Sequence, residues 1–203
     1  MSDHPQPHPF QPDIEDSPFT RYQVMAESVI ELLTEKGVFS ADDMRRTLER
    51  IDAITPAQGS RAVARAWVDE AFRARLLDNV NAATAELGID AGPIPIRAVE
   101  NTADVHNVIV CTLCSCYPRM LLGLPPDWYK SRAYRSSVVR EPRAVLEAFG
   151  THIPDGVEVR VHDSTAELRY MVIPMRPAGT TDLDEAGLAE LVSRDAMIGT
   201  AVI

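Results

Sequence analysis

Long hydrophobic runs are missing from this chain of 203 residues, and no apolar stretch approaches the roughly 20 residues that cross a bilayer. We therefore expect no membrane partner. Basic residues are fewer than acidic ones, 20 against 30, which gives a formal net charge of -10. Because contacts to phosphates need clustered Lys and Arg, this balance argues against a nucleic-acid partner.

Cysteine is also scarce, and its placement is unusual. The three cysteines, Cys111, Cys114 and Cys116, lie within one stretch of six residues. Cysteines this close in sequence cannot cross-link distant segments, which excludes a disulfide framework. The first residues, MSDHPQPHPFQPD, lack the apolar core of a secretory signal peptide. The sequence thus predicts a cytoplasmic protein.

The residue pattern divides the chain into three parts. Residues 1–19 are rich in Pro, His and Asp, and we expect them to form a flexible arm. Residues 20–88 have apolar residues at helical spacing, which predicts a helical N-terminal region. Residues 89–203 mix short apolar runs, prolines and helical patterns, and they carry all three cysteines. The composition, 45% apolar and 25% charged, is that of an ordinary globular protein.

Two local signals position helices in the second part. Ser40 and Asp43 have the spacing of a capping box, so a helix is expected to begin after Ser40. A further helical run is expected from Pro56 to Gly88, with a break near Asp69.

The third part predicts a mixture of strands and helices. Residues 88–102 contain two prolines and indicate an irregular connection. HNVIV, residues 106–110, predicts a buried strand that leads into the cysteines. VEVRVHD and ELRYMVI, residues 157–163 and 167–173, predict two strands paired with each other, and residues 183–194 predict a last helix. The fold class expected is α+β.

The segment VCTLCSCYPR, residues 110–119, is called the cysteine loop below. Its C-x2-C-x-C spacing does not suit a structural zinc site, which needs four ligands, because only His106 lies nearby. An iron–sulfur cluster needs about four thiolates, and there is no fourth cysteine. Three buried cysteines acting as small apolar side chains are the least favoured interpretation.

The geometry of the loop suggests another ligand set. Cys114 and Cys116 flank one residue, so their sulfurs can lie on the same side of the segment. The backbone amides of Ser115 and Cys116 lie between them, and Cys111 can approach as an axial ligand. A metal held in this way has five ligands: two sulfurs, two deprotonated amides and one axial sulfur. One coordination position then stays open for substrate. Ionising an amide requires a strongly polarising metal such as trivalent cobalt or iron.

The cysteine loop resembles the metal-binding segment of the nitrile hydratase α subunit, in the family that includes the thiocyanate hydrolase γ subunit. The resemblance extends over roughly residues 20–203. Segments that carry it include RAVARAWVDEAFRARLL, VENTADVHNVIVC, LGLPPDWYK and DSTAELRYMVIPMRPAGT. It implies an extended helical N-terminal arm, followed by a layered α/β C-terminal domain that holds the metal. It also implies a hetero-oligomer with a β-type subunit, possibly split into two chains, and a metallochaperone or activator.

The resemblance further implies roles for individual residues. Cys111, Cys114 and Cys116 match the sulfur ligands, and Ser115 and Cys116 match the amide-nitrogen ligands. Cys114 would be oxidised to a sulfinate and Cys116 to a sulfenate, and these two cysteines would be the catalytic residues. Thr112 matches the cobalt-type variant, so non-corrin Co(III) is expected, with Fe(III) as the alternative. The implied reaction is the hydration of a small nitrile to its amide.

Arg119 is the main departure from the family pattern. Cobalt-type nitrile hydratases usually have Trp at the matching position, whereas Arg resembles the thiocyanate hydrolase branch, where a cation suits an anionic substrate. A pocket glutamine that many relatives carry is also missing, since residues 89–100 contain none. Thiocyanate hydrolysis is therefore the alternative activity, and a metal-carrying subunit without catalysis is the non-enzymatic alternative. Arg119 is expected to lie in the substrate pocket.

Overall fold

The structure is a computed structural model, and it describes residues 20–203. The predicted flexible arm, residues 1–19, lies outside the described residues. Two compact units are present, Met1–Ile51 and Asp52–Ile203. The second unit contains all four strands and the cysteine loop.

The first unit contains two helices with strong N-terminal caps. Helix α1, Arg21–Glu35, begins at a capping box in which Thr20 and Gln23 bond to each other's backbone amides. Helix α2, Ala41–Asp52, begins where the sequence predicts. Neither helix contains a buried residue.

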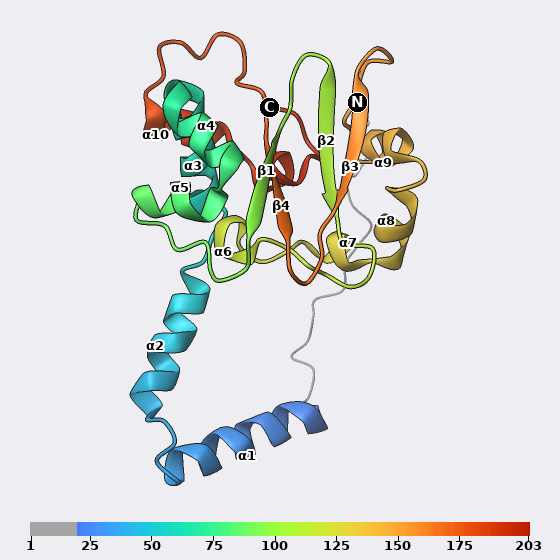
Figure 1. The fold of residues 1–203 in the computed structure, drawn as a ribbon. Coiled ribbons are helices and arrows are strands. Elements are labelled where there is room, and N and C mark those ends of the chain that lie inside the picture. Colours follow the sequence, from blue (N-terminus) through green and yellow to red (C-terminus); the bar gives the residue numbers. More distant parts are fainter. Residues whose placement is uncertain (1–19) are drawn as a thin grey trace, which may run out of the picture. The chain divides into compact units, whose positions relative to one another are not determined.

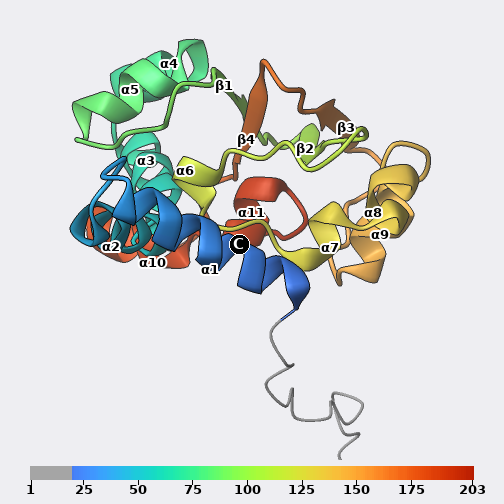
Figure 2. The ribbon, with the colours of Figure 1, turned by 90° about the horizontal axis from the view of Figure 1, so that it is seen from below.

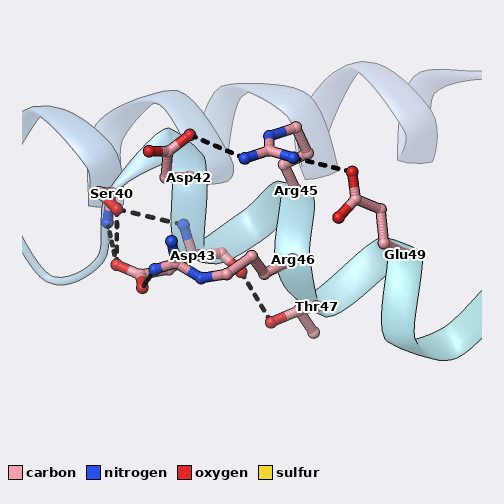
Figure 3. A network of polar contacts seen from close by, with 7 residues as sticks. All are labelled: Ser40, Asp42, Asp43, Arg45, Arg46, Thr47 and Glu49. Atoms are coloured by element: carbon pink, nitrogen blue, oxygen red, sulfur yellow. Dashed lines mark hydrogen bonds and ion pairs between the residues drawn. The ribbon is translucent and has the colours of Figure 1, made fainter.

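Polar contacts around the start of α2 explain why the helix begins there (Figure 3). The Asp43 carboxylate accepts from the amide and hydroxyl of Ser40, at 2.9 and 2.6 Å, and the Asp43 amide donates to Ser40 Oγ. Hydrogen bonding to Ser40 lowers the pKa of Asp43 to about 2. Arg46 adds an ion pair to Asp43, and Arg45 bridges to Glu49 one turn later. The predicted capping box is confirmed.

The long helical run of the second unit is divided into three helices: α3 (Ala57–Val68), α4 (Glu70–Asp78) and α5 (Val80–Glu86). The predicted break at Asp69 is confirmed, and Asp69 caps α4 by accepting from the Phe72 amide. A second break, at Asn79, was not predicted from the sequence. Asn79 caps α5 in the same way, because short polar side chains compete for backbone amides inside a helical run.

The four strands form two parallel pairs: β1 (Ile96–Glu100), β2 (Val105–Val110), β3 (Glu158–Asp163) and β4 (Arg169–Ile173). Strand β1 pairs with β4, and β2 pairs with β3. The predicted pairing of residues 157–163 with 167–173 is therefore wrong. Both strands exist, but each pairs with a strand from an earlier part of the chain. Alternation of apolar residues predicts which face of a strand is buried, but it does not predict the neighbouring strand.

The predicted irregular connection over residues 88–102 is also wrong in its second half, which forms β1. Both prolines, Pro93 and Pro95, precede the strand and so interrupt no ladder bond inside it. Ile96 and Ala98 are buried in alternation with the exposed Arg97. The strand predicted at residues 106–110 is confirmed as β2.

The remaining helices are short: α6 (Arg119–Leu122), α7 (Asp127–Lys130), α8 (Arg132–Ser137), α9 (Pro142–Ala148), α10 (Glu185–Leu191) and α11 (Arg194–Ile198). Within the second unit, α4 and α5 contact β1, whereas α9 contacts β3 at the other side of the strands (Figures 1 and 2). Helix α11 packs against β2 and β4. The predicted last helix is confirmed as α10, and two extended residues, Val192 and Ser193, separate it from α11.

The core of the second unit lies between the strands and these helices. Val108, Ile109, Val110 and Met171 are fully buried there. Gly199 lies so close to β2 that a Cβ atom on it would meet the backbone oxygen of Asn107 at 1.9 Å. Only glycine fits at that position, which brings the end of α11 against the strand that leads to the cysteines.

The predicted α+β class is confirmed, since helices surround small parallel sheets in one unit. Among the helices of residues 20–203, none combines the length and apolarity needed to span a bilayer.

Candidate metal centre

The cysteine loop starts where β2 ends. Cys111 follows Val110 directly and is buried, Cys116 is half-buried and Cys114 is exposed. The Sγ atoms of Cys111 and Cys114 are 3.7 Å apart, and those of Cys114 and Cys116 are 3.4 Å apart. All three sulfurs lie within 4.8 Å of one another, and no disulfide joins them. Three thiols from one loop therefore point at one position.

Side chains from outside the loop hold its two ends. The Asp163 carboxylate, at the end of β3, accepts from the Thr112 amide at 2.9 Å and from the Thr112 hydroxyl at 2.6 Å. At the other end, the Tyr129 hydroxyl donates to the backbone oxygen of Cys116 at 2.9 Å. Because Tyr129 is fully buried, its pKa is raised and its hydroxyl stays protonated as a donor.

The strand before the loop is anchored in a similar way. The hydroxyl of Tyr134 donates to the backbone oxygen of Ile109 at 2.7 Å, and the Ser164 amide donates to the backbone oxygen of Val110 at 2.7 Å. Burial raises the pKa of Tyr134 as well. The strand therefore delivers Cys111 from a fixed backbone.

The thiols of Cys114 and Cys116 differ in acidity. The hydrogen bond with Cys116 lowers the pKa of Cys114, and the Ser115 backbone adds to this effect. Burial raises the pKa of Cys116 to about 12, while the positive charge of Arg169 acts in the opposite direction. The exposed Cys114 is therefore the more acidic of these two thiols.

A cavity of about 410 Å³ opens directly beside the loop. The residues that line it are Cys114, Ser115, Cys116, Tyr117, Arg119, Leu124, Pro125, Lys130 and Arg169. The predicted pocket residue Arg119 is among them. Sequence reasoning missed Lys130 and Arg169, and no local signal could have placed them, because they come from α7 and β4.

The donor set fits a transition metal. Three sulfur atoms converge on one side of the loop, and the Cys114 amide donates to Cys111 Sγ at 3.3 Å, so the backbone between them folds toward the sulfurs. Soft thiolates select ions such as cobalt, iron or zinc over magnesium and calcium. No fourth protein sulfur or imidazole joins the group, and it is the one cluster of three such ligands within residues 20–203.

The three histidines that the structure describes, His106, His152 and His162, take no part in this group. His106 is buried at the start of β2, where its Nε2 donates to the backbone oxygen of Gly199 at 2.7 Å. His162 donates from Nε2 to the Asn107 side chain at 2.8 Å. His152 is exposed beside Glu147. None of these three histidines lines the cavity beside the cysteine loop.

Comparison of the chain with known proteins identifies its family. A family model described as nitrile hydratase, alpha chain, matches residues 20–201. The chain belongs to the nitrile hydratase alpha-chain family. It is 47% identical over 186 residues to the high-molecular-weight cobalt-containing nitrile hydratase subunit alpha of Rhodococcus rhodochrous, covering 90% of this chain and 92% of that protein.

Thiocyanate hydrolase proteins are also similar to this chain over most of their length. The thiocyanate hydrolase subunit gamma of Thiobacillus thioparus is 38% identical over 193 residues, which cover 89% of this chain and 79% of that subunit. A solved structure of a recombinant thiocyanate hydrolase with partially modified cobalt centres matches with a TM-score of 0.84 and 38% identity, over 91% of each chain. The predicted family resemblance is confirmed, and the fold agrees with it.

Proposed function

We propose that this chain is the metal-bearing subunit of an enzyme that hydrates a nitrile to the corresponding amide. The observation that carries the proposal is the convergence of three sulfur atoms beside an open cavity at the end of β2. An open position next to the ligands is what separates a catalytic metal site from a structural one. The net reaction adds one water molecule across the carbon–nitrogen bond, so no oxidant or reductant is needed.

Cobalt is the proposed metal, with iron as the alternative. Cys111, Cys114 and Cys116 would hold it through sulfur, and Ser115 and Cys116 through their backbone nitrogens. A trivalent ion bound there would supply Lewis-acid polarisation of the nitrile. Relatives whose names state that they contain cobalt support this choice.

The chain's own residues would supply the nucleophile and its support. In the active form we propose a sulfinate on Cys114 and a sulfenate on Cys116. The sulfenate oxygen would attack the nitrile carbon, and one water molecule would then hydrolyse the adduct to the amide and regenerate the sulfenate; alternatively, the sulfenate would orient a water that attacks directly. The neighbouring Arg169 would stabilise negative charge on Cys116, which is already within its electrostatic influence.

A second subunit is part of the proposal. Helix α1 presents large apolar residues to solvent, including Met25 and Val29, and it buries none within its own unit. Such a face is typical of a helix that packs on a partner. We propose a β-type subunit as that partner, an activator that loads the metal, and a cytoplasmic location.

The test begins with the metal. Protein co-expressed with its β-type partner in cobalt-supplemented cells should contain about one cobalt per chain and hydrate nitriles. Cys111→Ala should lose the metal, while Leu113→Ala, which removes an exposed side chain from the same loop, should keep it. Stoichiometric zinc after growth in cobalt would contradict the proposal.

Mass spectrometry tests the proposed nucleophile. Peptides from active enzyme should carry two added oxygens on Cys114 and one on Cys116, with Cys111 unmodified. Full activity with three unmodified thiols would show that the sulfenate is not required.

Thiocyanate hydrolysis is the second candidate, because Arg119 lines the cavity and thiocyanate hydrolase is among the similar proteins. A guanidinium that lines the cavity favours anionic or hydrogen-bonding substrates. Arg119→Trp should shift kcat/KM toward an apolar nitrile and away from thiocyanate, by roughly 10-fold or more, with cobalt content unchanged. Equal ratios in both proteins would mean that Arg119 does not face the substrate.

A further inference from the structure

Three cations line the cavity beside the cysteine loop, and each comes from a different element. Arg119 begins α6, Lys130 ends α7 and Arg169 begins β4. None of the side chains lining the cavity is acidic. The charged side chains of the cavity are thus all basic, although the whole chain has 30 acidic and 20 basic residues.

These cations are also without acidic partners. Within residues 20–203, none of the three forms an ion pair, whereas Arg73, Arg75 and several other arginines do. The Nη1 atom of Arg169 is sealed from solvent and has no hydrogen-bond partner. A buried donor left unpaired is costly, which indicates that something else completes it.

Hydrogen bonds fix the backbone near two of the three cations, Arg169 and Lys130. The Arg169 amide donates to the backbone oxygen of Pro95 at 2.9 Å, which holds the start of β4 on β1. Tyr129, the residue before Lys130, is tied to Cys116 by its hydroxyl, so α7 cannot move without the loop. This bond links the backbone next to Lys130 to the cysteine loop.

The three cations divide into two groups by depth. Arg169 is half-buried and lines the cavity together with Cys116. Arg119 and Lys130 are exposed and lie toward solvent. They are free to meet a second group of a molecule whose reacting end lies at the sulfurs.

We propose that Arg119 and Lys130 form an anion subsite, so that the preferred substrate is an organic nitrile that also carries a carboxylate. The inference rests on the proposed nitrile hydration and names its substrate class. The planar guanidinium of Arg can bind a carboxylate through two parallel hydrogen bonds, and the flexible Lys side chain adds a second positive charge.

The size of the cavity favours an organic molecule over thiocyanate. One water molecule takes about 30 Å³ in the liquid, so three non-hydrogen atoms occupy only a fraction of about 410 Å³. A cavity of this volume is in the range that binds small organic ligands. The cavity has room for a nitrile whose carboxylate is separated from the nitrile by a ring or short chain.

The experiment compares matched nitriles on the cobalt-loaded complex with its β-type partner. The pair is 3-cyanobenzoate and its neutral isostere 3-cyanobenzamide. We expect kcat/KM to favour the carboxylate by about 10-fold at low salt, with the preference falling as ionic strength rises. Lys130→Met should reduce the preference about 10-fold, and Lys130→Arg, which keeps the charge, should restore most of it.

A binding measurement separates this inference from the proposed function. Benzoate, which has no nitrile, should bind the complex in isothermal titration, and Lys130→Met should weaken binding about 10-fold. Hydration of both nitriles at equal kcat/KM, unaffected by Lys130→Met, would overturn the anion subsite and leave the proposed function standing. If benzoate binding depends on Lys130 but the complex hydrates no nitrile, the anion subsite stands and the proposed function is overturned. Absent benzoate binding, or binding that Lys130→Met does not alter, would also overturn the subsite.

Discussion

At the scale of single residues, the cysteine loop depends on side chains that its own sequence does not contain. Tyr129 and Asp163 lie 13 and 51 residues from the loop positions they bond, and each fixes one end of it. Both contacts bind backbone or a hydroxyl and leave the sulfurs free. The ligands can therefore come from a short segment because its geometry is imposed from outside.

Tyr129→Phe tests this dependence. The change removes one hydroxyl that holds the backbone oxygen of Cys116 and keeps the buried ring. We expect a stability loss of about 1 kcal/mol, the typical value for one hydrogen bond, together with a lower kcat and a shifted sulfur-to-metal absorption band. Cobalt content should stay near one per chain, since all ligands remain.

Tyr134→Phe is the matched control. Its hydroxyl makes a bond of similar length, but to Ile109 in the strand, and the residue is almost as buried as Tyr129. A comparable stability loss without a spectral shift is expected. If the two variants change the absorption band equally, Tyr129 has no special hold on the loop.

Sequence information was sufficient for the features that neighbours along the chain determine. The capping box of Ser40 and Asp43, the break at Asp69 and the ligand spacing of the loop all depend on residues within a few positions of each other. The cations of the cavity could not be predicted in this way. Lys130 and Arg169 reach the loop only because two elements distant in sequence pack there.

At the scale of elements, strand pairing shows the same limit. Alternation in β3 and β4 marked both as strands, but a hairpin and two separate parallel pairs bury the same faces. The choice depends on polar groups as well as on apolar ones. Asn107 of β2 bonds the backbone oxygen of Glu100 in β1 and the His162 side chain in β3, so it links both pairs.

The histidine of this network predicts a pH dependence. His106 Nε2 donates to Gly199, while Nδ1 accepts from the amide of Asn101, whose oxygen is already held by Asn107. Only the neutral ring satisfies both contacts, and burial lowers the pKa of His106 below 6.5. Burial likewise lowers the pKa of His162.

Stability should therefore fall on the acid side. Above pH 6.5 both states hold the neutral ring; below it the unfolded chain binds the proton first, so the free energy of unfolding decreases. The slope can reach about 1.4 kcal/mol per pH unit for each histidine. In urea unfolding between pH 5 and 8, His106→Gln should flatten the dependence, while the exposed His152→Gln should not. If the free energy of unfolding changes equally with pH in the unchanged protein and in both variants, His106 does not cause the pH dependence.

At the scale of the whole molecule, the two units differ in how they bury apolar residues. The second unit has a continuous core that includes Phe72, Leu76 and Ile109. The first unit has no buried residue in either helix. Helix α1 nevertheless carries an apolar row at helical spacing, Met25, Val29 and Leu32, each about half exposed. A helix of 15 residues is marginal alone, so a partner is expected to stabilise it.

Val29→Asp tests whether the β-type subunit is that partner. The change places a charge in the middle of the apolar row, and an unpaired carboxylate buried at an interface destabilises the complex by several kcal/mol. Since 1.4 kcal/mol is tenfold in affinity, co-purification with the β-type subunit should weaken by well over 10-fold. Glu27→Gln, on the opposite face of α1, is the control and should assemble normally. Far-UV circular dichroism checks that both variants stay folded. The second unit, Asp52–Ile203, is unchanged in each variant and provides the reference signal. Assembly of Val29→Asp at the affinity of the unchanged protein would show that the apolar row of α1 faces something other than this partner.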